Sequence, residues 1–300
     1  MVINMKKFLG MVLSLTLIFC LGGYSSLAET NKDIFQMSKA EFADYCDSLP
    51  QAQANYSEEE INQLLHQFAT SNYAPEYEQE LNRAGYYVYS RPAEDEEQIM
   101  PMSDGSAVNL SGVTIMYGSG KWALIMGGYW TNLSKISSDM SEAGPWLGFY
   151  EGATRNCGGV DAFGFVFYNQ SGPMPVTVDS SGFIHNGEGT QIDLYNPSIY
   201  QSDKGIMFEY QDYIQCTKYK SPYSYDWNYM GYGFSAIVHY NSSFENFHGR
   251  ARSVYCHTWK STSISKLNFS ASKSSFNLGI EFSNNESRQF TIYNGSDTVF

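Results

Sequence analysis

The chain has 300 residues, of which 43% are hydrophobic, 16% aromatic and 16% charged, so it carries enough apolar side chains for a packed core and is not disordered throughout. Its formal net charge of −13, from 31 acidic and 18 basic residues, disfavours nucleic-acid binding through a basic groove. Residues 29–104 hold 16 acidic and 4 basic residues, whereas residues 105–300 hold 15 and 12. The acidity therefore belongs mainly to the N-terminal part.

Residues 1–28 are typical of a secretory signal peptide. Lys6 and Lys7 precede an apolar run at residues 8–23, and small residues follow up to Ala28. We predict cleavage near Ala28 and a secreted, extracellular protein, since the bulky residue before Cys20 disfavours lipid attachment there. No second apolar stretch of membrane-spanning length follows, so we expect no transmembrane segment after cleavage.

Residues 29–90 form an acidic region with helical patterns. Ser38 and Glu41, and likewise Ser57 and Glu60, have the spacing of capping boxes at helix N-termini. After each box the apolar residues recur at helical spacing, and they are Phe42, Tyr45, Cys46, Leu49, Ile61, Leu64, Leu65 and Phe68. A third helix is predicted over residues 76–84 and a strand over residues 86–90. These helices are too short to form their own core, so we expect them to pack on each other and on the rest of the chain.

Beyond residue 90 the pattern changes. Residues 91–105, with two prolines and an acidic run at residues 94–97, are predicted to be a solvated linker. Residues 106–300 then show apolar side chains with a period of two, separated by turn residues, and strands are predicted at 113–117, 122–130, 160–168, 176–179, 191–195, 206–217, 233–240, 252–259, 267–271, 276–282 and 288–293. About eleven short strands without intervening helices predict a mainly β fold, either an antiparallel β-sandwich or a jelly roll.

Four cysteines remain once the signal peptide is removed, which is an even number in an oxidising compartment. Cys216 and Cys256 lie in predicted strands at positions that we expect to face the core, so we prefer a Cys216–Cys256 bridge. Cys46 and Cys157 would then pair and tie the helical region to the β domain. The alternative is that one or both pairs stay reduced, because four cysteines in this length do not make a dense disulfide framework.

An unusual aromatic segment runs from residue 219 to residue 232. In its centre Tyr223, Tyr225, Trp227 and Tyr229 alternate with Ser224, Asp226 and Asn228, so in an extended chain the rings share one face. One interpretation is an exposed platform on which sugar rings or a peptide stack while Asp226 and Asn228 hydrogen-bond nearby. The other is that the rings fill the core of the sandwich.

No compact catalytic or metal-binding motif is present. The sequence has no nucleophile elbow, and His239 and His257 have no second ligand at a local metal spacing, so we predict neither a metal nor another cofactor. The alternative is a metal site assembled from distant strands, which would leave no local motif. Glycan hydrolysis by a pair of carboxyl groups cannot be recognised from local spacing, because the two acidic residues can come from distant strands. Glu209 is the best single candidate for it, and its partner would be Glu151, Asp161 or Glu281.

These observations favour a secreted or cell-surface binding protein that recognises a glycan or a surface partner through exposed aromatic residues. The alternative is an extracellular glycan hydrolase of β-sandwich fold, which rests on analogy of fold and on the available acidic residues. The sequence favours a protein that is not an enzyme, because the aromatic segment is its most distinctive feature.

Overall fold

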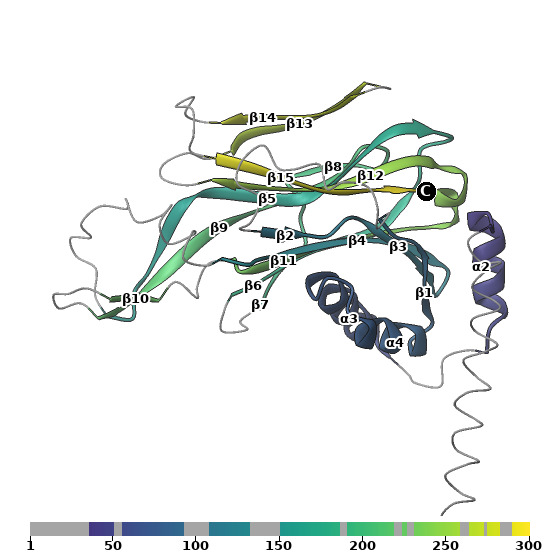
Figure 1. Cartoon of the computed structure of the whole chain (residues 1–300), viewed down its shortest axis with the longest axis horizontal. Coiled ribbons are helices and arrows are strands. Elements are labelled where there is room, and N and C mark those ends of the chain that lie inside the picture. Colours follow the sequence, from purple (N-terminus) through teal and green to yellow (C-terminus); the bar gives the residue numbers. More distant parts are fainter. Residues whose placement is uncertain are drawn as a thin grey trace, which may run out of the picture.

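The computed structural model describes residues 36–50, 56–92, 108–132, 151–186, 191–218, 224–226, 231–258, 264–272, 275–282 and 290–300, and the structural statements below refer to these residues. They form two antiparallel sheets that stack face to face, with helices on the outer face of one sheet and a separate hairpin over the other (Figure 1). The prediction of a mainly β fold with a sandwich, preceded by a helical region, is confirmed.

The first sheet, sheet A, has the strand order β1-β3-β4-β11-β6-β7, and β2 also pairs with β4. Its strands are β1 (Tyr86–Ser90), β2 (Val108–Leu110), β3 (Thr114–Gly118), β4 (Lys121–Trp130), β6 (Thr177–His185), β7 (Gln191–Leu194) and β11 (Gly233–Tyr240). Strand β1 comes from the region that the sequence assigns to the helical part, and it pairs with β3. The N-terminal region therefore contributes a strand to the sandwich.

The second sheet, sheet B, has the order β10-β9-β5-β12-β15, and β8 also pairs with β9. Its strands are β5 (Thr154–Ser171), β8 (Ile199–Gln201), β9 (Gly205–Lys218), β10 (Ser224–Asp226), β12 (His248–Thr258) and β15 (Phe290–Val299). A hairpin of β13 (Ile264–Ser272) and β14 (Ser275–Phe282) lies over its outer face (Figure 1). Beneath this hairpin, Ala162, Met207 and Cys256 form a small apolar cluster.

The main core lies between the two sheets. Alternate residues of each strand point into it, so Phe163, Phe165 and Phe167 of β5 meet Phe234 and other residues of sheet A. The intervening residues of sheet A form a second apolar cluster under the helices. Because both faces of its central strands are covered, β11 is buried along its whole length and its sequence shows less alternation than a half-exposed strand would.

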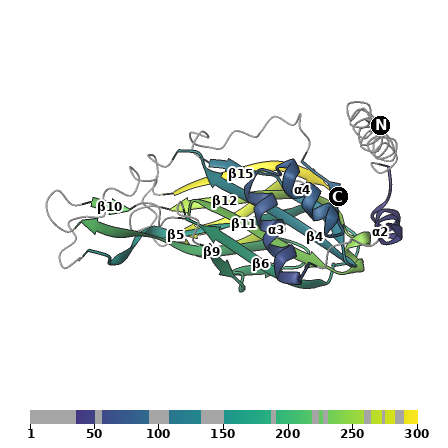
Figure 2. The ribbon, with the colours of Figure 1, turned by 90° about the horizontal axis from the view of Figure 1, so that it is seen from below.

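Three α-helices are described: α2 (Lys39–Ser48), α3 (Glu58–Thr70) and α4 (Pro75–Arg83). Both predicted capping boxes are present, at Ser38 and Ser57. Helices α3 and α4 lie side by side across the outer face of sheet A (Figure 2). Helix α2 packs at one end of the sandwich, beside the 3-10 helix η2 (Ser242–Asn246).

A buried lysine attaches α2 to the sandwich. Lys39 is only 2% exposed, and its Nζ donates a hydrogen bond to the main-chain carbonyl of Phe247. The same ammonium group lies 4.4 Å from the centre of the Phe244 ring and 5.1 Å from that of Phe300. Main-chain and ring contacts together hold the charged end of this side chain.

Most of the predicted strands agree with the structure to within a few residues, but β5, β6 and β15 each extend six residues beyond one end of the predicted range. In β6 the extension has a clear cause. The sequence after residue 179 contains two serines and Gly182, which are typical of a turn. In the structure Gly182 lies inside the strand. A Cβ atom at this position would come within 2.7 Å of the Phe208 ring, so a larger residue would not fit. The glycine therefore permits close packing between the sheets.

Two predictions lie outside the described residues: the signal peptide at residues 1–28 and most of the linker at residues 91–105. Among the described helices, none is long and apolar enough to cross a membrane.

Candidate functional site: a buried acid–histidine centre

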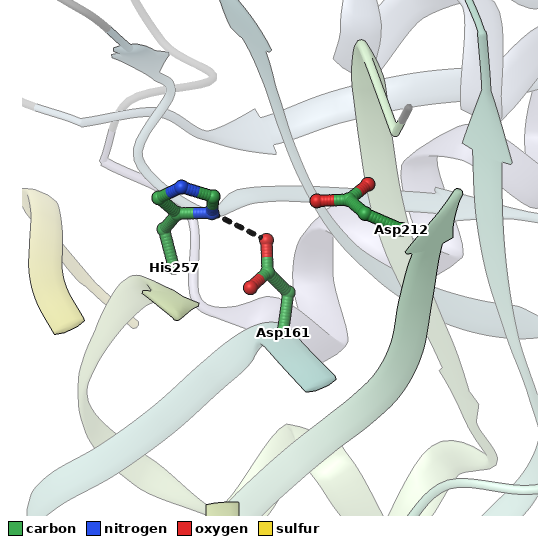
Figure 3. Close-up of side chains that lie close together, drawn as sticks. All are labelled: Asp161, Asp212 and His257. Carbon is green, nitrogen blue, oxygen red and sulfur yellow. Dashed lines mark hydrogen bonds and ion pairs between the residues drawn. The ribbon is translucent and has the colours of Figure 1, made fainter. Parts of the chain in front are cut away.

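Three ionisable side chains meet inside the sandwich, and we call them the acid–histidine centre. Asp161 comes from β5, Asp212 from β9 and His257 from β12, which are three adjacent strands of sheet B (Figure 3). One potential ligand atom from each of the three residues lies within 4.8 Å of the other two. The exposed fractions are 0%, 3% and 1%, so the centre is shielded from solvent.

Strand register explains this meeting. Asp161 pairs with Tyr210 on β9, and Asp212 lies two residues further along, on the same face. On the other side Cys256 pairs with Ala162, so the next residues, His257 and Asp161, stand opposite each other. All three side chains continue the inward-facing rows that elsewhere hold the phenylalanines of the core.

Asp161 is the best-connected group of the centre. Its Oδ2 accepts hydrogen bonds from the Tyr255 hydroxyl at 2.7 Å and from Nδ1 of His257 at 2.8 Å. Its Oδ1 accepts a hydrogen bond from the main-chain N–H of Thr258 at 2.7 Å. These donors suit an ionised carboxylate, and the contact with His257 fixes the orientation of the imidazole ring.

Asp212 has a different environment. Its Oδ1 accepts a hydrogen bond from the main-chain N–H of Gly231 at 2.7 Å. Burial, and next the negative charge of Asp161, raise the pKa of Asp212 to about 8, although His257 and the Gly231 N–H act in the opposite direction. At neutral pH this carboxyl group therefore holds a proton or needs a nearby positive charge.

Aromatic side chains enclose the centre. Trp130 of β4, in the opposite sheet, donates from Nε1 to the Tyr255 hydroxyl at 3.2 Å, and its ring meets the His257 ring edge-on at 4.8 Å. Burial raises the pKa of Tyr255 and that of Tyr210 well above the usual value, so both hydroxyl groups stay protonated. They can donate hydrogen bonds to the carboxylates but do not supply negative charge.

Another buried histidine, His66, belongs to α3 and faces sheet A. Nδ1 of His66 is 2.7 Å from the Ser235 hydroxyl, and its ring stacks on Phe183 at 4.7 Å. Nearby, Nδ1 of His239 is 2.6 Å from a carboxylate oxygen of Asp179. Burial, and to a smaller extent His239, lower the pKa of His66 to about 3, so His66 seats the helix on sheet A as a neutral ring.

The predicted aromatic platform lies at the edge of sheet B. The backbone of residues 224–226 forms the edge strand β10, which pairs with β9. The side chains of Tyr223, Tyr225, Trp227 and Tyr229, and those of Asp226 and Asn228, are outside the described residues. Their role in ligand binding stays a prediction.

Glu209 does not belong to the acid–histidine centre. It pairs with Ala162, which lies in the apolar cluster on the outer face of sheet B, whereas Asp161 points into the core. Glu209 and Asp161 therefore cannot act on the same bond from facing positions. The pairing of these two acidic residues for glycan hydrolysis is not supported by this geometry.

Neither predicted disulfide is formed, because Cys46 and Cys256 are free and buried. Cys216 is seven residues beyond Glu209 on β9, and β5 lies between β9 and β12, so the strands hold Cys216 far from Cys256. Cys46 lies on α2, whereas Cys157 belongs to the start of β5, which pairs with the part of β9 that also pairs with β10. The expectation that Cys256 faces the main core was also wrong, because it lies under the β13–β14 hairpin.

Large apolar side chains are exposed on one edge of the sandwich. Of the seven exposed large hydrophobic residues among those described, six lie between residues 174 and 200. We call them the β6–β8 rim, and they are Met174, Val176, Val178, Ile192, Tyr195 and Tyr200. The pairing of β7 with β6, and a hydrogen bond from the Tyr200 hydroxyl to Thr177, connect this stretch.

The sequence carries one signal for the centre, which is the position of charged residues on strand faces that face the core. Asp161 and Asp212 interrupt strand faces that are otherwise apolar, and His257 does the same on β12. Local spacing does not predict that Asp161 and His257 meet, because 96 positions separate them and only the order of the strands brings them together. Comparison with known proteins adds no assignment: no family model matches the chain, and no similar curated protein was found.

Proposed function

We propose that this chain is an exported binding protein that recognises a protein partner at the cell surface through the β6–β8 rim. The observation that carries the proposal is the concentration of exposed apolar side chains on this edge, where Tyr195 is 71% exposed and Met174 is 65% exposed. Apolar groups gathered on one part of a surface are typical of an interaction site.

The chemistry of the rim favours a protein over a glycan. Four of its six side chains are aliphatic, and sugar rings stack mainly on aromatic groups. Ile192 of the rim belongs to β7, which is the last strand in the order of sheet A and therefore an edge strand. Its neighbours Gln191 and Asp193 are also exposed. An edge strand offers main-chain donors and acceptors to an extended segment of a partner, while neighbouring side chains supply apolar contacts.

Equilibrium binding of the labelled mature protein to intact cells of the source organism tests this proposal. We expect the double variant Val178→Asp with Tyr195→Asp to bind at least about tenfold more weakly, since both changes place charge in an apolar contact. The matched control is Val299→Asp, because Val299 is a large apolar residue that is exposed but lies outside the rim.

Treatment of the cells identifies the partner class. Protease treatment should abolish binding, and periodate oxidation of surface glycans should leave it intact. The proposal is contradicted if the rim variant binds like the wild type. It is also contradicted if periodate alone abolishes binding and the pair Tyr225→Ala and Trp227→Ala loses it, which would instead favour glycan recognition by the aromatic segment.

A further inference from the structure

We propose that Asp161, Asp212 and His257 form a binding site for a divalent first-row transition metal ion. The proposal is independent of the β6–β8 rim. It rests on three potential ligands from three adjacent strands whose ligand atoms lie within 4.8 Å of one another in the interior of the sandwich.

The charge balance of the centre points to a cation. Two carboxyl groups are buried together, and His257, paired with Asp161 at 2.8 Å, can balance at most one of their two negative charges. Among the described residues no lysine or arginine forms an ion pair with either carboxyl group. Asp297, a buried carboxylate elsewhere on sheet B, shows the usual alternative, because Arg252 donates to both of its oxygens at 2.6 and 2.7 Å. Buried charges are normally paired in this way or coordinate a metal.

The ligand set selects the class of ion. One imidazole and two carboxylates suit Zn²⁺, Mn²⁺ or Fe²⁺, whereas Ca²⁺ and Mg²⁺ are bound almost entirely by oxygen. Zinc ligands lie at about 2.0–2.2 Å from the ion, so two ligands of a tetrahedral site are about 3.4 Å apart. The potential ligand atoms of the centre lie within 4.8 Å of one another, so ion binding would draw the three side chains closer together.

Neighbouring groups already orient the three ligands. The Tyr255 hydroxyl and the Thr258 N–H hold Asp161, the Gly231 N–H holds one oxygen of Asp212, and the Trp130 ring packs against His257. Such contacts fix ligand orientation in known metal sites and strengthen binding. A divalent ion would replace the proton between Nδ1 of His257 and Oδ2 of Asp161 and any proton on Asp212, and these protons would be released to solvent.

Calorimetric titration of the chelator-treated mature protein with Zn²⁺, and separately with Mn²⁺, tests the site. We expect binding of a single ion per chain and a rise in the melting temperature when the ion is present. Asp212→Asn keeps the size of the side chain and its acceptor for Gly231, and it should weaken binding by about tenfold or more. The matched control Asp297→Asn removes another buried carboxylate of sheet B and should leave the affinity unchanged.

Circular dichroism checks that each variant is folded, and X-ray absorption of the zinc-loaded wild-type protein gives an answer that needs no variant. We expect the spectrum to show one imidazole and oxygen ligands in the coordination shell of the zinc ion. The proposal is overturned if the wild type binds neither ion, if Asp212→Asn binds as tightly as the wild type, or if the zinc shell contains no imidazole.

Discussion

The Asp161 carboxylate and the His257 imidazole face each other across β5 and β12, with Nδ1 and Oδ2 2.8 Å apart, although the residues are separated by 96 positions in the sequence. Their contact is buried, so neither group can exchange its partner for water. The stability of this end of the sandwich should therefore depend on the charge of Asp161.

Asp161→Asn should destabilise the fold by about 3–5 kcal/mol, because the amide nitrogen cannot accept the hydrogen bonds that an oxygen of Asp161 accepts. Urea unfolding followed by fluorescence measures the loss. Asp193→Asn, at an exposed position of β7, should change stability by less than about 0.5 kcal/mol. Equal effects at both positions would show that the buried contact contributes little.

Acid should weaken the packing of α3 through His66. Its pKa is lowered to about 3 in the folded state, against about 6.5 in an unfolded chain. Between these values the unfolded state binds more protons, so the contribution of His66 is complete above pH 6.5 and is lost as the pH falls.

From pH 7 to pH 5 we expect a loss of about 2 kcal/mol from this residue. The measurement is the unfolding free energy at both pH values for the wild type and for His66→Gln, which keeps a polar group but does not titrate. The difference between the two proteins should change with pH, and a constant difference would contradict the assignment.

A rise in pH above 7 should increase the stability of the fold through Lys39. Burial lowers the pKa of Lys39 to about 7, while Glu245 opposes the shift, and an unfolded lysine titrates near pH 10.4. The unfolded state therefore binds more protons between these values, and the wild type gains stability as the pH rises, by at most about 1.4 kcal/mol per pH unit.

Lys39→Met fills similar space without titrating, so it isolates this effect. The variant should be the more stable protein at pH 7, and its advantage should shrink toward pH 10. Urea unfolding of both proteins at four pH values provides the test, and parallel curves would show that Lys39 keeps its ordinary protonation in the fold.

The two described free thiols should resist modification in the native protein. Cys46 and Cys256 are buried, and burial raises the pKa of both thiols. Ellman's reagent should leave them unmodified until guanidinium unfolds the chain, since the thiolate is the reactive form. Mass spectrometry of non-reduced peptides provides the second readout, and a peptide joined through Cys46 or Cys256 would contradict the structure.

The sequence predicted the elements that follow local rules. The capping boxes at Ser38 and Ser57 depend on residues three positions apart, and β11 coincides with its predicted range because turn residues border it on both sides. The three-residue strands β2, β8 and β10 were not predicted as strands, since their pairing depends on neighbours far along the chain. The local sequence pattern indicates the secondary structure that a segment favours, whereas pairing with distant segments determines whether a short segment becomes a strand.

The acid–histidine centre illustrates the same limit. Alternation placed Asp161 in a strand with three phenylalanines on its face, but only the order of β9, β5 and β12 brings Asp212 and His257 beside it. The preferred Cys216–Cys256 bridge failed for a related reason, because a favourable face does not specify which strands are adjacent. Charged residues on apolar strand faces were the available signal.

The attachment of α2 also sets an order of assembly. Lys39 is held by Phe247, Phe244 and Phe300, more than 200 residues later in the chain. During synthesis the amino group of Lys39 has none of these partners until those residues have emerged, although α2 also contacts β1 and β3. Contacts of such long range slow folding, so a chain threaded through a membrane pore with its N-terminus first would leave the Lys39 amino group without its buried partners until the final strand has crossed.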